Sequence, residues 1–325
     1  MGKGFVNLLL LVLACLLCIP DASALTLRSA DVHSEDYPTV QAVRYMGQLL
    51  NERSGGRISL EVLHSGQLGE EKELLEQCRA GGLDMMRTNL APLSDTVPEI
   101  VVPALPYLFR SEEHLHKVLD GPIGREILVA LESSDLIGLA FYDSGARSFY
   151  NTRKPLRSVE DFKGLRLRVQ QSDIFKSLVE SLGAVAVPLP FGEVHNALRT
   201  GFIDGAENNW PSYESTGHFK EAKYYTVDGH SMTPEVLVFS RKVWADLSGE
   251  DKKLILKAAE DSVPYMRSLW REREAQARRA MEQAGVEVVD IADRDPFIRA
   301  VKPVYDRYMS MEKVPDLIRR IQNTQ

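Results

Sequence analysis

The order of short apolar strands and amphipathic helices in the first 90 residues restricts the fold more than any other feature of this sequence. Three strand patterns alternate with two helix patterns, in the order 25–30, 39–53, 57–63, 70–80 and 83–89. Strands that are joined through helices by short connections pair in parallel, and helices then cover both faces of the sheet. The same β-α-β rhythm restarts near residue 147. The sequence therefore predicts an α/β protein with two lobes.

A single long helical pattern follows the second set of strands. It runs from Gly249 to Gln283, with Ser248 as an oxygen-bearing cap and Gly285 as its end. At 1.5 Å per residue such a helix approaches about 50 Å, which exceeds the width of one lobe. We expect it to lie across both lobes and to bend at Pro264.

Two further strand patterns, at 224–230 and 236–240, return the chain through the middle of the protein. Together with the restart near residue 147, they predict two discontinuous lobes. The predicted ranges are 25–146 with 234–272 for lobe I, and 147–233 with 273–325 for lobe II.

The N-terminus has the pattern of an export signal. A basic residue, Lys3, precedes an apolar run from Phe5 to Ile19, and small residues at 22–24 fit a signal-peptidase site. The apolar run is shorter than the roughly 20 residues that a membrane-spanning helix needs. We therefore predict a signal peptide at 1–24 and a mature protein in the periplasm. A lipoprotein signal ending at Cys15 or Cys18 is the alternative.

Composition excludes several classes of protein. Of three cysteines only Cys78 lies beyond the predicted signal, so the mature chain cannot form an intramolecular disulfide. The net charge of −7 argues against a nucleic-acid partner. His114 and His116 are two residues apart and cannot share a helix face, and no GxSxG or HExxH motif occurs. We expect no metal, no cofactor and no catalysis.

The segment from Lys163 to Val169 carries two arginines on one face of a predicted strand. Its apolar residues alternate with Arg166 and Arg168, and a polar turn that begins at Gln170 follows. Ligands of open α/β sheets bind at strand ends, and a guanidinium holds a carboxylate through two parallel hydrogen bonds. The alternative is that both arginines are solvated residues of an edge strand.

Arg168 is one of seven polar residues that follow predicted strands or begin predicted helices. They are His33, Glu71, Asn89, Arg147, Arg168, Asn208 and Trp210. Each alone fits a cap or a turn, but together they combine arginines for a carboxylate, asparagines for hydroxyl groups and a tryptophan for a sugar ring. A polyhydroxylated acid would use all three.

Five motifs occur in one order along the chain: GQLG at 66–69, PYLF at 106–109, FKGLRLRV at 162–169, PFGEV at 190–194 and DGAEN at 204–208. In this combination the sequence resembles the solute-binding proteins of TRAP (tripartite ATP-independent periplasmic) transporters, DctP type, over essentially the whole mature chain. The resemblance implies a periplasmic binding protein, with two α/β lobes around a ligand cleft and a long helix spanning both.

The resemblance also implies roles for individual residues. Arg168 corresponds to the arginine that clamps the ligand carboxylate, Asn208 to a ligand contact and Arg147 to a second basic contact. Arg166 is then an outer residue, although strict alternation places it on the same face as Arg168. A twist or bulge before Gln170, or a position of Arg166 further from the cleft, must separate the two arginines.

Three departures from the family pattern bear on the ligand. Gln170 stands where many members have proline, and Asn209-Trp210 follow Asn208 where proline is frequent. The segment 145–151 is similar to a subgroup that takes sugar acids. We therefore predict a hexuronate such as galacturonate or glucuronate, with another hydroxy or sugar acid, a dicarboxylate or a keto acid as alternatives.

The resemblance further implies partners: a small-molecule sugar acid and the small and large membrane subunits of a TRAP transporter. We expect the binding protein to be a monomer. Two other hypotheses remain at this point. One is an exported enzyme that processes a sugar acid, with Glu71 and His33 as the candidate acid and base, and the other is a ligand sensor for a membrane kinase.

Overall fold

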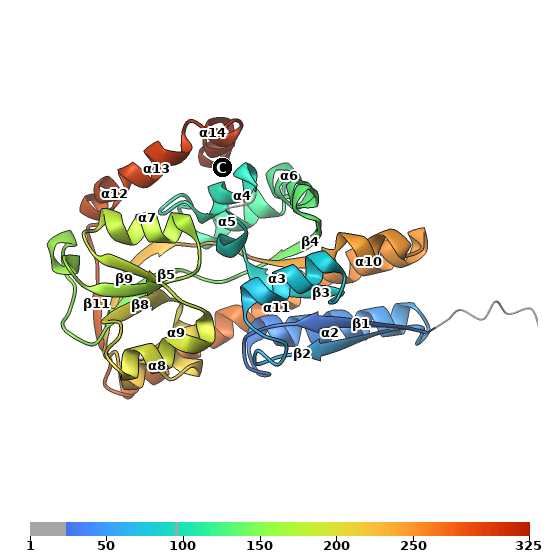
Figure 1. Ribbon diagram of the computed structural model, residues 1–325, viewed down its shortest axis with the longest axis horizontal. Helices are drawn as coiled ribbons and strands as arrows, with labels where there is room; N and C mark the ends of the chain where they lie inside the picture. Colours follow the sequence, from blue (N-terminus) through green and yellow to red (C-terminus); the bar gives the residue numbers. More distant parts are fainter. Residues whose placement is uncertain (1–23, 95–96) are drawn as a thin grey trace, which may run out of the picture.

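The computed structural model describes residues 24–94 and 97–325, so the predicted signal peptide lies outside the described residues except for Ala24. The described chain forms two sheets, which lie side by side in Figure 1 with helices around them. None of the described helices combines the length and the hydropathy that crossing a membrane requires. The predicted α/β fold with two lobes is confirmed.

The sheet of lobe I has the strand order β2-β1-β3-β10-β4. Its strands are β1 (Leu25–Ala30), β2 (Ile58–Leu63), β3 (Met85–Asn89), β4 (Leu136–Tyr142) and β10 (Glu235–Ser240). β1 pairs in parallel with β2 and β3, whereas β10 returns antiparallel between β3 and β4. Met85 and Met86 lie in different apolar clusters, so both faces of the sheet are buried.

Helices cover both faces of this sheet. They are α2 (Pro38–Arg53), α3 (Glu71–Ala80), α4 (Pro98–Val101), α5 (Glu112–Leu119), α6 (Pro122–Ala130) and α10 (Arg241–Asp246). The capping box of Glu70 and Glu73 begins α3, and Gly81 in the left-handed region ends it. This places Glu71 in the first turn of α3.

The sheet of lobe II has the strand order β11-β9-β5-β8-β6-β7. Its strands are β5 (Arg147–Asn151), β6 (Arg166–Val169), β7 (Val185–Pro188), β8 (Gly205–Asn208), β9 (Tyr224–Ser231) and β11 (Glu287–Asp290). Its helices include α7 (Asp173–Ser181), α8 (Val194–Arg199) and α9 (Trp210–Ser215). The sequence did not predict β5 as a strand. All five of its residues are buried, but Arg147, Ser148 and Asn151 are polar and obscure the apolar pattern.

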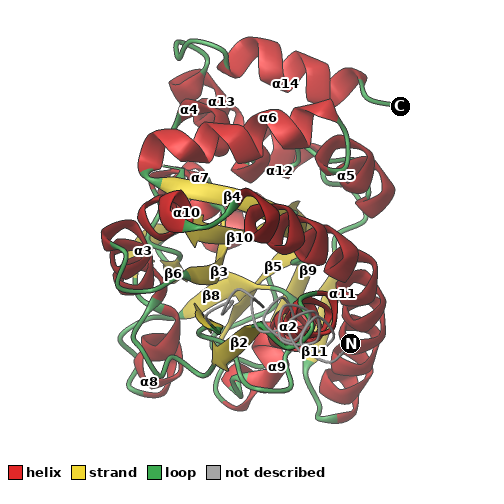
Figure 2. Cartoon of the chain, turned by 90° about the vertical axis from the view of Figure 1, so that its right-hand side faces the viewer, coloured by secondary structure: helices red, strands yellow, loops and turns green. Residues whose placement is uncertain are grey.

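The long helix α11 (Gly249–Gln283) has the predicted bounds and joins the two lobes. Its first half packs on α2 and β4 through Ile255 and Met266, and its last turns pack on lobe II through Ala277 and Met281. Figure 2 shows α11 running along the outside of the sheets. Pro264 lies inside the helix without interrupting it.

The three closing helices are α12 (Asp295–Ala300), α13 (Lys302–Tyr308) and α14 (Val314–Asn323). α13 packs on α7 of lobe II, but α14 packs on α4 and α6 of lobe I. The Ile321 carbonyl lies 2.9 Å from His114 Nε2 on α5. This differs from the predicted boundary, which assigns all of 273–325 to lobe II, because an apolar stripe does not specify which lobe it packs on.

Candidate ligand-binding site

A pocket lies between the lobes, where strands of both sheets end. It is lined from lobe I by Val32, His33, Glu71, Arg87, Asn89 and Glu235, and from lobe II by Arg147, Arg168, Gln170, Phe191, Asn208, Asn209 and Ser212. The structure thus brings every predicted site residue to this pocket except Trp210.

The lobes touch across the pocket. The Tyr37 and Ser212 hydroxyl oxygens are 2.8 Å apart, and the Ser94 and Ser172 hydroxyl oxygens are 3.1 Å apart. The Gly192 N–H donates to Glu70 at 3.2 Å. The structure is therefore a closed arrangement of the lobes, in which a ligand would contact both walls.

Arg168 is a buried cation without a protein carboxylate. Its side chain comes from β6, is 3% exposed, and donates from Nε and Nη2 to the Leu189 carbonyl at 2.9 and 2.7 Å. Among the described residues no ion pair joins Arg168 to an acidic group. Burial lowers its pKa below the ordinary value of arginine. A ligand carboxylate would supply the missing counter-ion.

Arg166 lies on the same face of β6 but further from the pocket. It is partly exposed and paired with Asp204, with 3.0 Å between Nε and Oδ2. No twist or bulge is needed to separate the two arginines, because two residues along one strand place them about 7 Å apart.

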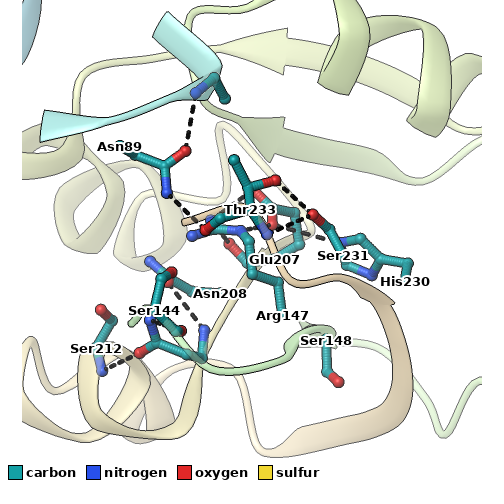
Figure 3. A network of polar contacts seen from close by, with 12 residues as sticks. Asn89, Ser144, Arg147, Ser148, Glu207, Asn208, Ser212, His230, Ser231 and Thr233 are labelled. Atoms are coloured by element: carbon teal, nitrogen blue, oxygen red, sulfur yellow. Dashed lines mark hydrogen bonds and ion pairs between the residues drawn. The ribbon is translucent and has the colours of Figure 1, made fainter. Parts of the chain in front are cut away.

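Arg147 is paired with a protein carboxylate. From β5 its Nε and Nη2 donate to the two carboxylate oxygens of Glu207 at 2.6 and 2.9 Å (Figure 3). Burial lowers the pKa of Arg147, but Glu207 outweighs that effect and the pKa lies above its usual value. His230 extends the group: burial lowers its pKa, yet Asp228 and Glu207 raise it to about 9. This buried cluster therefore neutralises Arg147, whereas Arg168 has no carboxylate partner among the described residues that line the pocket.

The facing wall of lobe I is anionic. Arg87 on β3 is buried and binds three carboxylates, those of Asp31, Glu71 and Glu235, with distances of 2.9 Å from Nη1 to Glu71 and to Glu235. One guanidinium cannot neutralise three carboxylates. The pKa of Glu71 is raised by burial, and the charge of Glu235 adds to the effect although Arg87 opposes it.

The sequence interpretation missed Arg87, Asp31 and Glu235. The alternation of side chains along a strand could have identified Arg87. It stands two residues before Asn89 in the predicted strand 83–89 and therefore lies on the same face as Asn89. Asn89 itself donates from Nδ2 to Glu235 at 3.2 Å and to the Thr233 carbonyl at 3.3 Å. Figure 3 shows this asparagine from lobe I close to Arg147 and Asn208 from lobe II.

Three other predicted residues complete the lining. Gln170 is buried, and its Oε1 has no hydrogen-bond partner among the described residues, which leaves this oxygen able to accept a hydrogen bond in the pocket. Asn208 accepts from the Asn209 N–H at 2.9 Å. The His33 ring stacks on Tyr37 with 3.8 Å between centroids, and burial together with Arg87 lowers its pKa to about 3. His33 is therefore neutral at neutral pH.

Trp210 does not line the pocket. It is 5% exposed, stacks on Tyr225 with 3.7 Å between centroids, and belongs to the apolar core of lobe II. Asn209 caps α9 and Ser212 faces the cleft, so Trp210, two residues before Ser212, points to the opposite side of the helix. Phe191, which lies edge-on to His33 at 4.9 Å, supplies an aromatic face in the pocket instead.

Two α/β lobes that close over a pocket with one unpaired arginine define a class, the two-lobed binding proteins for small organic anions. The sequence matches the DctP family, described as bacterial extracellular solute-binding protein, family 7, over residues 29–312. The chain belongs to this family.

Similar proteins agree with this assignment. A "Solute-binding protein" of Chromohalobacter salexigens is 35% identical, over 94% of this chain and 91% of that protein. A TRAP periplasmic solute-binding protein of Bradyrhizobium sp. BTAi1, in complex with α/β-D-galacturonate, is 54% identical with a TM-score of 0.91, covering 92% and 100% of the two chains. One of Pseudomonas putida F1, with bound D-glucuronate, is 38% identical with a TM-score of 0.89, covering 93% and 98%.

Proposed function

We propose that this protein binds a hexuronate, D-galacturonate or D-glucuronate, in the periplasm and delivers it to the membrane subunits of a TRAP transporter. The observation that carries this proposal is the charge of the pocket. One wall presents Arg168, a buried cation without a counter-ion, and the other presents the carboxylates around Arg87.

This arrangement orients a hexuronate. The carboxylate pairs with the guanidinium of Arg168, and the hydroxyl groups donate to Glu71, Glu235 and the Gln170 Oε1 atom. Hydrogen bonds to charged acceptors are about twice as strong as neutral ones, so an anionic wall suits hydroxyl donors. Phe191 offers an apolar face to the sugar ring.

The same charges disfavour other ligands. A dicarboxylate bound to Arg168 would direct its second carboxylate toward Glu71 and Glu235, and like charges at short distance repel. A neutral hexose would leave Arg168 buried and unpaired. The bound sugar acids of the similar solved structures support this choice.

The proposal does not include catalysis. Glu71 is held by Arg87 at 2.9 Å, and His33 has a pKa of about 3, so His33 cannot act as a proton donor at neutral pH. The transfer partner is the pair of small and large membrane subunits, which receive the closed and loaded protein.

A thermal-shift screen tests the ligand class. D-galacturonate and D-glucuronate should raise the unfolding temperature most, because a ligand at 100 times its dissociation constant adds about 2.7 kcal/mol to stability. D-galactose, succinate and L-malate at the same concentration serve as controls. A larger shift with a dicarboxylate would contradict the proposal, and so would new products in mass spectra of galacturonate incubated with the protein.

A further inference from the structure

A second cluster of metal-ligating side chains lies outside the ligand pocket, where the chain first passes from lobe I to lobe II. Glu112 and His116 are one turn apart on α5, and Asp143 follows directly after β4. One potential ligand atom from each of the three residues lies within 4.8 Å of the others. The sequence pointed to His114 and His116, which cannot share a face, and gave no sign of Asp143.

We propose that Glu112, His116 and Asp143 bind a divalent transition-metal ion. His116 Nε2 lies 3.0 and 2.9 Å from the two carboxylate oxygens of Asp143, and 3.8 Å from Glu112 Oε1. Zinc bonds of about 2.1 Å in tetrahedral geometry place ligand atoms about 3.4 Å apart. The distances from His116 Nε2 lie on both sides of that value, and each pair of the three ligand atoms lies within 4.8 Å.

Unpaired polar atoms at this place support the proposal independently. Two buried side-chain oxygens at this place, Glu112 Oε1 and Ser144 Oγ, have no hydrogen-bond partner among the described residues. Glu112 Oε1 is one of the proposed ligand atoms. Ser144 is 1% exposed and directly follows Asp143 in the chain. Buried oxygens normally have partners, and an oxygen can bind an ion or accept from a water that the ion holds, so these two atoms fit a bound ion with its water.

The charges around the cluster are negative in sum. Arg267 lies with Nε 3.5 Å from Asp143, but its two Nη atoms each donate to Asp120 at 2.8 Å. Glu112, Asp143 and Asp120 thus place three carboxylates around the one guanidinium of Arg267. A cation would relieve this repulsion.

The donor set indicates the kind of ion. One imidazole with two carboxylates suits zinc, manganese or cobalt, whereas magnesium and calcium prefer oxygen donors alone. The side chain of His116 is 19% exposed, which leaves a path for the ion and a position for water. The ion would fix α5 to Asp143, next to Ser144, whose carbonyl accepts from Asn209 of the ligand pocket at 2.9 Å.

Calorimetric titration of the untagged mature protein with zinc chloride tests this site, with magnesium chloride as the control ion. We expect one zinc per chain, a zinc-dependent rise in unfolding temperature and no response to magnesium. His116→Gln should weaken zinc binding at least about tenfold, since even outer-shell partners of metal ligands are worth about 10- to 100-fold. Glu112→Gln should weaken it as well.

The matched control is His64→Gln, which removes a partly buried histidine near a single carboxylate, that of Glu35 at 3.9 Å. It should bind zinc as the wild type does, and circular dichroism should show that all variants are folded. The absence of zinc binding to the wild type would overturn the proposal. So would equal affinities of the wild type and of folded His116→Gln.

Discussion

Replacing Arg168 by methionine is expected to weaken binding of D-galacturonate by about 2–5 kcal/mol, or roughly 30- to 4,000-fold, because the ligand carboxylate would be buried without its partner. Arg168→Lys should still cost at least about 1.4 kcal/mol, since an ammonium cannot reproduce the two parallel hydrogen bonds of the guanidinium fork. Isothermal titration calorimetry measures both effects.

Arg166→Met is the matched control. It removes an arginine from the same strand and the same face, but one that is paired with Asp204 and does not line the pocket. Its affinity for galacturonate should match that of the wild type.

Thermal unfolding without ligand should show Arg168→Met to be at least as stable as the wild type, since the substitution removes a buried charge that no protein carboxylate pairs with. Wild-type affinity in Arg168→Met would refute the carboxylate clamp.

Replacing Arg87 by methionine is expected to lower the free energy of unfolding by about 3–5 kcal/mol, because it leaves the carboxylates of Asp31, Glu71 and Glu235 in lobe I without their shared cation. Burial raises the pKa of Asp31, but Arg87 outweighs burial and holds it below its usual value. Without Arg87, which lowers both values, the pKa values of Asp31 and Glu71 would be raised. Stability of the variant would then fall as the pH rises, and the deficit should be larger at pH 7 than at pH 5.

Urea denaturation at the two pH values measures this effect. Arg44→Met is the control, because it breaks an exposed ion pair with Glu35 and should cost no more than about 1 kcal/mol. A loss below 1 kcal/mol for Arg87→Met at pH 7 would show that Arg87 does not hold the anionic wall together.

Local patterns predicted the elements that have strong periodicity. The bounds of α11 followed from its cap, its apolar repeat and the glycine after it, and β6 followed from strict alternation. The family motifs predicted residues that the structure gathers in one pocket. Whether those residues contact the ligand stays a prediction.

Pairings between distant segments could not be predicted in the same way. Glu207 lies in a recognised motif, but its bond to Arg147 depends on the pairing of β5 with β8, and β5 itself was missed. Trp210 was placed in the site because its position follows a strand end, although helical rotation turns it into the core. The lobe on which α14 packs depends on long-range packing that one sequence does not reveal.

The most direct test of the proposed function is a calorimetric comparison of D-galacturonate with D-galactose on the wild-type protein. The two sugars differ at C6, where one carries a carboxylate and the other a hydroxymethyl group. If Arg168 binds the carboxylate, galacturonate should bind one to one and galactose should bind at least about 30-fold more weakly. Equal affinities, or no binding of galacturonate, would contradict a hexuronate-binding protein built around Arg168.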